Sequence, residues 1–227
     1  MIYRKIVIDL LRKGLSITET DKFKKEEIIH GYFFPLKKTS DEVSIENHNL
    51  WLIDERLAYN SFLASDKPFS SIAGMEEISE GRNKRPDIFS AAFATGESDK
   101  YKSLYSSLDI IEFKRPMREN YTVAENPIQQ IIEYLRIIRN NEAKTDPKRQ
   151  LHVMKNGVIY CHIICDITDN LQQFLDDKEF KQVGDLNWYM RFHSTYNAFI
   201  EVKSFDFVLE NAFYRNKVLF DKLGIQS

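Results

Sequence analysis

Apolar residues recur at helical spacing in the N-terminal third of the chain. The segment 2–15, IYRKIVIDLLRKGL, repeats them every three or four positions, and the segment 24–33, KKEEIIHGYF, predicts a second, shorter helix. A polar stretch, 37–49, then leads into the largely apolar segment 50–65, LWLIDERLAYNSFLAS, which ends shortly before Pro68. We interpret 50–65 as a third helix.

Beyond residue 80 the apolar runs become short and rich in β-branched and aromatic residues, as in strands. The segments 85–93, RPDIFSAAF, and 108–116, LDIIEFKRP, are joined by a polar loop and most simply form an antiparallel hairpin. The segment 125–139, ENPIQQIIEYLRIIR, has helical spacing, with Pro127 in its first turn. The remaining predicted elements are a strand at 158–167, a short helix at 169–177, strands at 188–193 and 198–205, and a helix at 206–223. This alternation predicts an α/β (α+β) protein with a mixed central sheet, flanking helices and a helical N-terminal part.

Composition is that of an ordinary soluble protein. The 227 residues suit one domain with a substantial core, or one domain with a small appendage, and 43% of them are hydrophobic and 29% charged. No apolar run approaches the roughly 18 residues needed to cross a bilayer, and no signal-peptide pattern is present. We therefore expect a cytoplasmic protein that does not contact a membrane.

The net charge of −2 argues against a protein that binds nucleic acid with a generally basic surface. Contact with phosphate must then depend on local basic groups or on bound cations. Groups of this kind are usually solvated surface. Three occur: Arg82, Lys84 and Arg85; Lys114, Arg115 and Arg118; and Lys144, Lys148 and Arg149.

Cys161 and Cys165 both lie in the predicted strand 158–167. Four residues along a strand separate them by roughly 13 Å, which is too far for a disulfide. Strand alternation places His162 on the opposite face, so the two thiols and this imidazole do not form a metal site. We expect both cysteines to pack in the core.

A glutamate and a lysine interrupt the apolar run LDIIEFKRP. Glu112 and Lys114 share one face of the expected strand, roughly 6.6 Å apart, while Phe113 points to the other face and into the core. If the preceding strand pairs with this one, Asp87 and Glu112 lie on neighbouring strands about 4.8 Å apart. Two converging carboxylates repel, and a shared divalent cation removes the repulsion while keeping water sites for a phosphate and a nucleophile. Lys114 is then placed to stabilise charge on the attacked phosphate or to help deprotonate the water.

Pro86-Asp87, followed by Glu112-Phe113-Lys114 at the end of the partner strand, resembles the signature of the PD-(D/E)XK nuclease superfamily. The resemblance implies a restriction-endonuclease-like fold and metal-dependent hydrolysis of phosphodiester bonds. It also implies that Asp87, Glu112 and the Phe113 carbonyl hold Mg²⁺ or Mn²⁺, and that Lys114 assists hydrolysis.

A second acidic-x-Lys triplet, Glu201-Val202-Lys203, lies in another strand-like run. Such a triplet alone is a weak signal, because it occurs by chance in most proteins of this size. This one lacks an upstream Pro-Asp partner and the helix that follows the first triplet. We interpret it as structural.

The helix after the first triplet carries Gln130 and Tyr134, which are neighbours along the border of its apolar stripe. Their spacing resembles the Gln-x-x-x-Tyr element of the RecB-like branch of the superfamily. The resemblance implies that Gln130 contacts the substrate phosphate or the attacking water, and that Tyr134 supports it or touches the backbone. The alternative is an amphipathic helix whose polar edge happens to hold these two residues.

Helical geometry over 50–65 places Glu55 among aromatic residues such as Trp51 and Tyr59. A buried carboxylate needs a cation, an arginine or a raised pKa. Many members of the superfamily bring an acidic residue from a helix that precedes the hairpin to the metal, and Glu55 is the position that we match to it. The alternative is a salt bridge to an arginine, or a partly exposed glutamate.

The five histidines are scattered. His30 and His48 lie close enough in sequence to Glu55 to reach the mouth of a site, but we expect both to be polar surface residues. No His-Asn-His cluster, phosphate-binding glycine loop or Ser/Cys nucleophile arrangement is visible in the sequence.

The leading hypothesis is a Mg²⁺- or Mn²⁺-dependent deoxyribonuclease with DNA as substrate. We divide the chain into a helical N-terminal extension, 1–46, and a nuclease-like domain, 47–227. More loosely, residues 48–68 with the hairpin resemble the C-terminal region of certain bacterial GHKL-type ATP-binding proteins. That resemblance implies an ATPase domain or subunit as partner and a role in antiviral defence. The alternative is a catalytically silent nuclease-fold module for nucleic-acid binding or subunit assembly, and a homo-oligomer is compatible with either.

Overall fold

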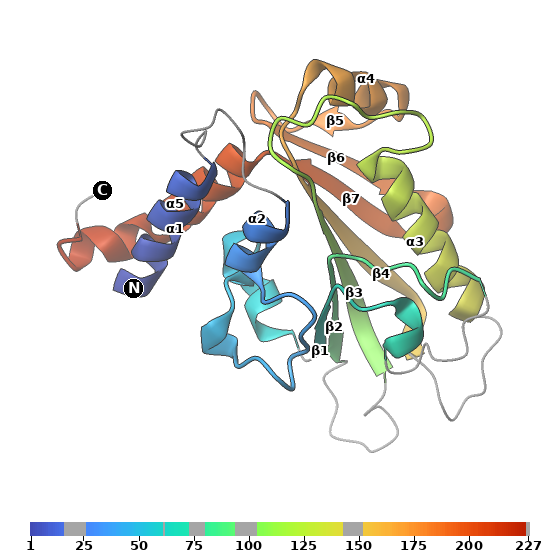
Figure 1. The fold of residues 1–227 in the computed structure, drawn as a ribbon, viewed down its shortest axis with the longest axis horizontal. Coiled ribbons are helices and arrows are strands. Elements are labelled where there is room, and N and C mark those ends of the chain that lie inside the picture. Colours follow the sequence, from blue (N-terminus) through green and yellow to red (C-terminus); the bar gives the residue numbers. More distant parts are fainter. Residues whose placement is uncertain (16–25, 61, 73–79, 94–103, 143–151, 226–227) are drawn as a thin grey trace.

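A mixed seven-stranded sheet forms the centre of the molecule (Figure 1). The computed structural model describes residues 1–15, 26–60, 62–72, 80–93, 104–142 and 152–225. The helices are α1 (Ile2–Leu15), α2 (Glu26–Phe33), α3 (Pro127–Glu142), α4 (Asp169–Asp177) and α5 (Phe205–Lys222). The strands are β1 (Phe62–Ser65), β2 (Ile88–Phe93), β3 (Leu104–Phe113), β4 (His152–Ile164), β5 (Lys181–Gln182), β6 (Trp188–His193) and β7 (Ala198–Lys203).

The strand order is β1-β2-β3-β4-β7-β6-β5. β3, β4 and β7 run parallel in the middle of the sheet, and the outer pairs are antiparallel. The parallel step from β3 to β4 needs a crossover, which α3 provides. The predicted α+β class with a mixed sheet, flanking helices and N-terminal helices is confirmed.

Helices cover both faces of the sheet (Figure 1). α3 and α4 pack on one face, in a core that contains Ile110, Leu135 and Ile163. α1, α2 and α5 lie on the other, in a core that contains Ile8 and Ile111. Strand alternation explains the division, because neighbouring residues of β3 such as Ile110 and Ile111 point to opposite faces.

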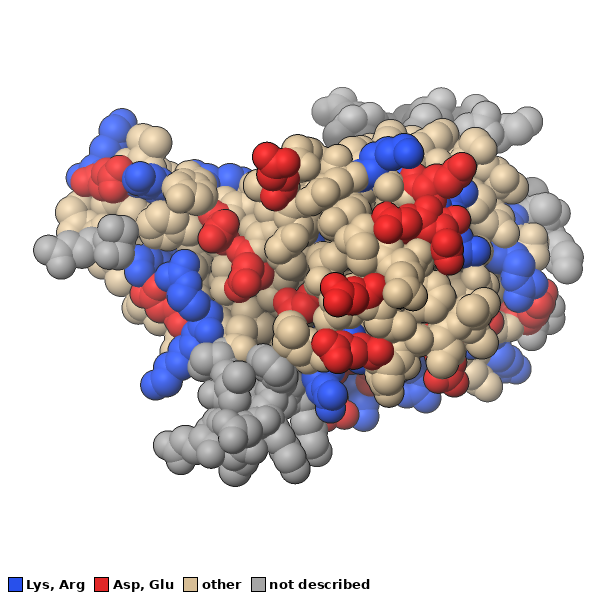
Figure 2. Space-filling model, turned by 90° about the horizontal axis from the view of Figure 1, so that it is seen from above, with Lys and Arg blue, Asp and Glu red and all other residues tan. Residues whose placement is uncertain are grey.

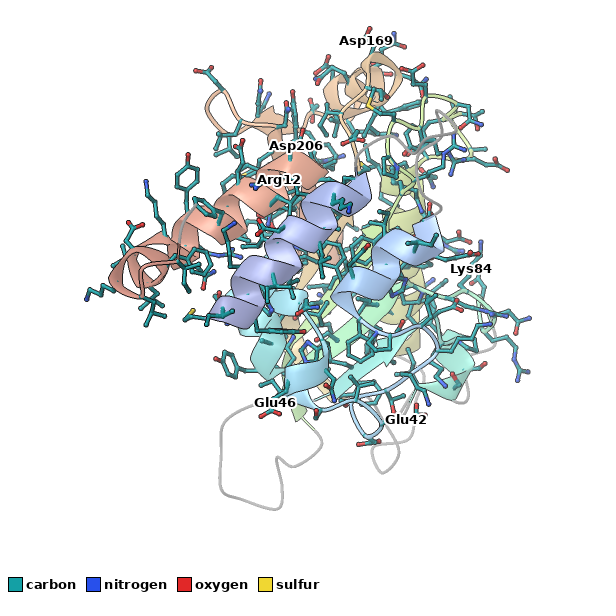
Figure 3. The ribbon with its side chains drawn as sticks, turned by 60° about the vertical axis from the view of Figure 1, so that its left-hand side comes forward. Arg12, Glu42, Glu46, Lys84, Asp169 and Asp206 are labelled. Carbon is teal, nitrogen blue, oxygen red and sulfur yellow. The ribbon has the colours of Figure 1, made fainter. Side chains whose placement is uncertain are left out.

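The N-terminal helices belong to the second core. α1 packs along α5 and α2 packs against β3, and Figure 3 shows α1 and α2 side by side in front of the sheet. A bridge between Thr39 and Ala64 ties the segment after α2 to β1. The boundary between residues 46 and 47 stays a prediction, but the hydrophobic core continues across it.

The predicted helix over 50–65 is wrong. The segment forms two 3₁₀ turns, η2 (Leu50–Leu52) and η3 (Glu55–Tyr59), and then strand β1. Extended backbone at Asp54 and Asn60 interrupts helical geometry, and the Asp54 side chain accepts a hydrogen bond from the Arg56 amide. Pairing of β1 with β2 overrides the helical spacing, since apolar runs of this length suit either structure.

The structure also bears on the predictions for the cysteines, for two histidines and for a membrane-spanning helix. Cys161 and Cys165 are buried and free, as predicted. His30 and His48 are only 2% and 3% exposed, so the expectation that they lie on the surface is wrong. Among the described residues, no helix has both the length and the apolar character needed to span a bilayer.

Candidate active site

The end of the β2–β3 hairpin brings Asp87 and Glu112 together. Ile88 is opposite Ile111 in the antiparallel register, so the two acidic residues occupy the next position on their strands. Oδ2 of Asp87 accepts a 2.6 Å hydrogen bond from the Phe113 amide. Burial and the neighbouring Glu112 charge raise the pKa of Asp87 well above its ordinary value. The two carboxylates therefore repel one another, as expected for converging acidic side chains on neighbouring strands.

Glu112 is almost fully enclosed, with 2% of its surface exposed. Its Oε1 accepts hydrogen bonds of 2.6 Å each from Lys114 Nζ and Gln130 Nε2. Its Oε2 is also buried, and within the described residues it has no hydrogen-bond partner. Burial raises the pKa of Glu112 against the opposing effect of Lys114. The backbone amide of Asp87 also lowers the pKa of Glu112, but it does not reach good hydrogen-bond geometry at Oε2. A poorly satisfied buried carboxylate oxygen is costly, so Oε2 is the atom of this site that most needs a ligand.

Lys114 follows the last residue of β3, and its side chain lies on the Glu112 face as predicted. Burial lowers the pKa of this amine, but the charges of Glu112, Glu26 and Asp87 raise it by more, and the net pKa lies above the ordinary value. The amine is therefore a cation at neutral pH. Of the two roles considered for Lys114, this favours stabilising negative charge over accepting a proton from water.

Phe113 points to the opposite face, where its ring packs against His30 of α2 at a centroid separation of 5.2 Å. His30 Nε2 lies 3.0 Å from Ser65 Oγ, and Nδ1 lies 3.9 Å from Asp87 Oδ1. Burial lowers the pKa of His30 to about 4. The imidazole is therefore neutral at pH 7 and does not offset the charge of Asp87.

Gln130 and Tyr134, the predicted pair, lie on α3 and connect this helix to the hairpin. Gln130 Nε2 donates to Glu112 Oε1 and also to Tyr134 Oη, at 2.7 Å. The Tyr134 hydroxyl in turn donates to the Arg85 carbonyl at 2.8 Å. Two residues four apart on a helix thus join β3 to the segment that carries Asp87.

Glu55, the predicted third acidic residue, instead pairs with α1. Both of its carboxylate oxygens accept from Arg4, at 2.7 and 2.9 Å, and its side chain is 38% exposed. The expectation of a buried carboxylate set among aromatic residues is wrong because the helix that it assumed does not form. The salt bridge to an arginine was the alternative, and we leave Glu55 out of the candidate site.

Glu26 is the acidic residue that sequence reasoning missed. It is the first residue of α2, and its Oε2 accepts a 3.0 Å hydrogen bond from the Arg115 amide, just beyond Lys114. Its charge raises the pKa of Asp87, Glu112 and Lys114. The sequence does contain a pair of glutamates, Glu26 and Glu27, at the start of a predicted helix before the hairpin. It does not show which of the two reaches the site.

No relative of the chain was found. Comparison with models of known families gave no match, and neither did searches of curated proteins and of solved structures. The superfamily resemblance therefore rests on the motif residues and their geometry alone.

A cleft of about 280 Å³ opens beside Lys114 and Gln130. Lys84, Arg118 and Tyr121 also line it. The Arg118 guanidinium lies over the Tyr121 ring, 4.9 Å from its centroid, and Figure 3 shows Lys84 at the outer edge of the molecule, on the side away from α5. Two of the three predicted basic groups thus contribute to this cleft, and the third lies outside the described residues.

The wider surface is not uniformly basic. Seen from above in Figure 2, acidic side chains predominate over the middle of that face, and basic ones lie mainly toward its margins. This distribution agrees with the net charge of −2. An anionic substrate would therefore be attracted mainly by the local cations of the cleft.

Within the described residues, no group of three or more His, Cys, Asp or Glu side chains is gathered closely enough to hold a metal ion. The donor chemistry nevertheless fits a hard divalent cation, because Mg²⁺ uses one or two carboxylates and keeps several waters. Asp87, Glu112 and the Phe113 carbonyl are the groups that would hold it. The unpartnered Oε2 of Glu112 is the specific feature that such an ion would satisfy.

The second triplet lies on the opposite face of the sheet, away from Glu112. Glu201 pairs with Lys203 at 2.8 Å and lies 3.0 Å from the buried His162, which is beside it on β4. The direct ion-pair partners of Glu201 among the described residues are Lys203 and His162. This arrangement supports the structural interpretation of the triplet.

Repulsion at the hairpin predicts that Asp87→Asn stabilises the metal-free protein at neutral pH. The asparagine oxygen can still accept the Phe113 amide, while the charge that burial and Glu112 disfavour is removed. A pKa that is raised on folding means that the folded state disfavours the charged carboxylate, so we expect a higher free energy of unfolding for the variant in EDTA at pH 7. Urea denaturation measures it.

The size of this effect depends on pH. The raised pKa of Asp87 means that its carboxyl takes up a proton as the pH falls through that pKa, and the repulsion then disappears. The gain from Asp87→Asn should therefore shrink on acidification and be lost below about pH 4, near the ordinary aspartate value. A variant less stable than the parent at pH 7 would show that Lys114 already compensates Asp87.

Proposed function

We propose that this protein is a Mg²⁺- or Mn²⁺-dependent nuclease that hydrolyses phosphodiester bonds in DNA. The observation that carries the proposal is the set of contacts at Glu112. One oxygen accepts hydrogen bonds from Lys114 and Gln130, the other is buried with no hydrogen-bond partner in the described part of the chain, and Asp87 lies beside it. Two mutually repelling carboxylates, one buried and one half-buried, are costly for stability alone. They are expected where a cation is bound during catalysis.

The bound metal would polarise the phosphate and activate the attacking water. Asp87, Glu112 and the Phe113 carbonyl would hold it. Lys114, kept cationic by the surrounding carboxylates, would stabilise the negative charge that develops on the phosphate. Gln130, fixed by its bond to Tyr134, would orient the phosphate or the water.

Residues that line the cleft would bind the DNA strand. Lys84 and Arg118 would contact backbone phosphates beside the scissile bond, and Tyr121 offers an aromatic face for a base. Lys84 now pairs with Glu133 at 2.9 Å, so phosphate binding would replace that partner. DNA as substrate, an ATPase domain or subunit as partner, a defence role and a homo-oligomer are proposals that rest on the resemblance.

One assay tests the proposal. Linear and circular DNA, and an RNA of the same sequence, are incubated with the protein in Mg²⁺, in Mn²⁺ or in EDTA. We expect cleavage of DNA with either metal and none in EDTA. Absence of cleavage of every substrate in every metal would support the silent binding or assembly module instead.

Glu26 and Glu27 form a matched pair for testing the third carboxylate. Glu26 contacts the Arg115 amide and acts electrostatically on the site, whereas Glu27 is exposed on the next position of α2. Glu26→Gln should raise the Mg²⁺ concentration for half-maximal cleavage by about tenfold, which corresponds to one lost charge interaction of about 1.4 kcal/mol. Glu27→Gln should leave it unchanged. Mg²⁺ titration of the cleavage rate measures both, and equal effects would remove Glu26 from the site.

A further inference from the structure

Helix α1 carries a second row of apolar side chains that the hydrophobic core does not use. The side of α1 that faces the core is buried, and its residues are Val7, Ile8, Leu11 and Gly14. Ile2, Ile6 and Leu10 are four residues apart, so they follow another side of the helix. Met1 and Tyr3 extend this row at its N-terminal end. Between 41% and 65% of the surface of each of these five residues is exposed, and we call them the α1 stripe.

The α1 stripe lies on the outer side of the molecule. In Figure 3, α1 lies in front of the sheet, and none of the other described helices and strands lies over it. Single exposed apolar residues are ordinary surface, whereas a continuous row of large ones indicates a contact site.

Three of the cations of α1 are paired within the protein. Arg4 binds both carboxylate oxygens of Glu55, Lys5 pairs with Asp9 at 2.7 Å, and Arg12 lies 3.8 Å from Asp9. An anionic membrane or a nucleic acid would need such cations to be available beside the apolar row. None of the five side chains of the stripe is charged, so its chemistry favours an apolar protein surface as the partner.

The spacing of the α1 stripe is self-complementary. If two copies of α1 cross antiparallel about a twofold axis at Ile6, each Ile6 contacts its copy, and Ile2 of each helix contacts Leu10 of the other. Apolar side chains then face apolar side chains along the contact, as an isologous interface between identical subunits requires. Rows of residues four apart also form the ridges through which helices most often interlock.

The area of the α1 stripe suits a weak dimer. Five large apolar side chains that are about half exposed offer roughly 100 Å² each, or about 1,000 Å² in total from two copies. Specific interfaces bury about 1,000 Å² or more, so the stripe reaches this lower limit before neighbouring residues contribute. We expect a dissociation constant on the order of 10 µM.

From the uncovered α1 stripe, its lack of charge and its symmetric spacing, we propose that a second copy of this chain docks on it. The protein then forms a twofold homodimer through antiparallel α1 helices. No residue of the stripe belongs to the proposed cleavage site, so the dimer does not depend on that function.

Sedimentation equilibrium at protein concentrations from about 1 to 200 µM tests the dimer. We expect a monomer–dimer equilibrium, and Ile6→Asp should weaken it at least about tenfold because association would bury two like charges at the axis. Val218→Asp is the matched control, since Val218 is an exposed apolar residue of α5 outside the stripe. It should associate like the parent. Melting curves establish that each variant is folded.

Cysteine cross-linking tests the antiparallel geometry. The two native cysteines are buried, so they do not interfere. Ile6→Cys brings two thiols together at the axis, and mild oxidation should give a covalent dimer. Ile2→Cys and Leu10→Cys should each stay unlinked alone, because identical positions are then roughly 12 Å apart along the helix, and should cross-link when mixed. Val218→Cys should not cross-link.

Four results would contradict the dimer. They are a monomer at every concentration, unchanged association of folded Ile6→Asp, an equal loss in Val218→Asp, and cross-linking of Ile2→Cys alone as readily as Ile6→Cys. A fifth, binding of the monomeric parent but not of Ile6→Asp to vesicles of phosphatidylserine and phosphatidylcholine, would assign the stripe to a membrane instead. DNA cleavage enters none of these measurements. A protein that dimerises in this way but does not cut DNA would keep the interface and lose the proposed function.

Discussion

Asp87→Asn and Glu112→Gln should each lower the rate of metal-dependent DNA cleavage by about 10³-fold or more. Each removes one charged metal ligand while keeping the shape of the side chain, and a catalytic metal contributes several kcal/mol of transition-state stabilisation. Cleavage of a labelled duplex over a range of Mg²⁺ concentrations measures the loss. Asp87→Asn should at the same time be more stable than the parent in EDTA, and loss of activity with gain of stability separates catalysis from folding.

Two variants serve as controls for these carboxylates. Asp185→Asn removes an exposed aspartate. Glu201→Gln removes a glutamate that, like Glu112, pairs with a lysine two residues further on. Both should cut DNA at nearly the parent rate. Near-parent cleavage by folded Asp87→Asn or Glu112→Gln would show that the hairpin is not the metal site.

The hairpin site was predictable because its signal is local. The strand period of two residues places Glu112 and Lys114 on one face and Phe113 on the other whatever the rest of the chain does. The four-residue spacing of Gln130 and Tyr134 is equally local on a helix. Bringing them to Glu112 required only that α3 follow β3 and pack back on the same sheet.

Glu26 and Glu55 show where local patterns fail. The spacing in 50–65 fits a helix as well as it fits turns followed by a strand, and pairing with β2 decides between them. Because the predicted helix does not form, Glu55 pairs with Arg4 of α1, a contact between residues 51 positions apart. Glu26 reaches Arg115 across 89 positions. Such contacts depend on how α1 and α2 pack, which one sequence does not show.

Lys114 and Lys203 give the sharpest test of which acidic-x-Lys triplet belongs to the site. Both are buried, and both pair with the glutamate two residues earlier, at 2.6 and 2.8 Å. Only Lys114 also lies near Asp87 and contacts the cleft beside Gln130. Lys203 lies on the other face, with Trp188 5.5 Å away.

Lys114→Ala should keep the metal ligands and DNA binding but lose about 3–4 kcal/mol of transition-state stabilisation, or roughly 10²- to 10³-fold in rate. Lys203→Ala should leave the rate nearly unchanged. Single-turnover cleavage of a labelled duplex at saturating Mg²⁺ and protein compares them, because saturation removes affinity as an explanation. Melting temperatures show whether each variant is folded at the assay temperature. A large loss for Lys203→Ala with a small one for Lys114→Ala would move the reaction to the opposite face of the sheet.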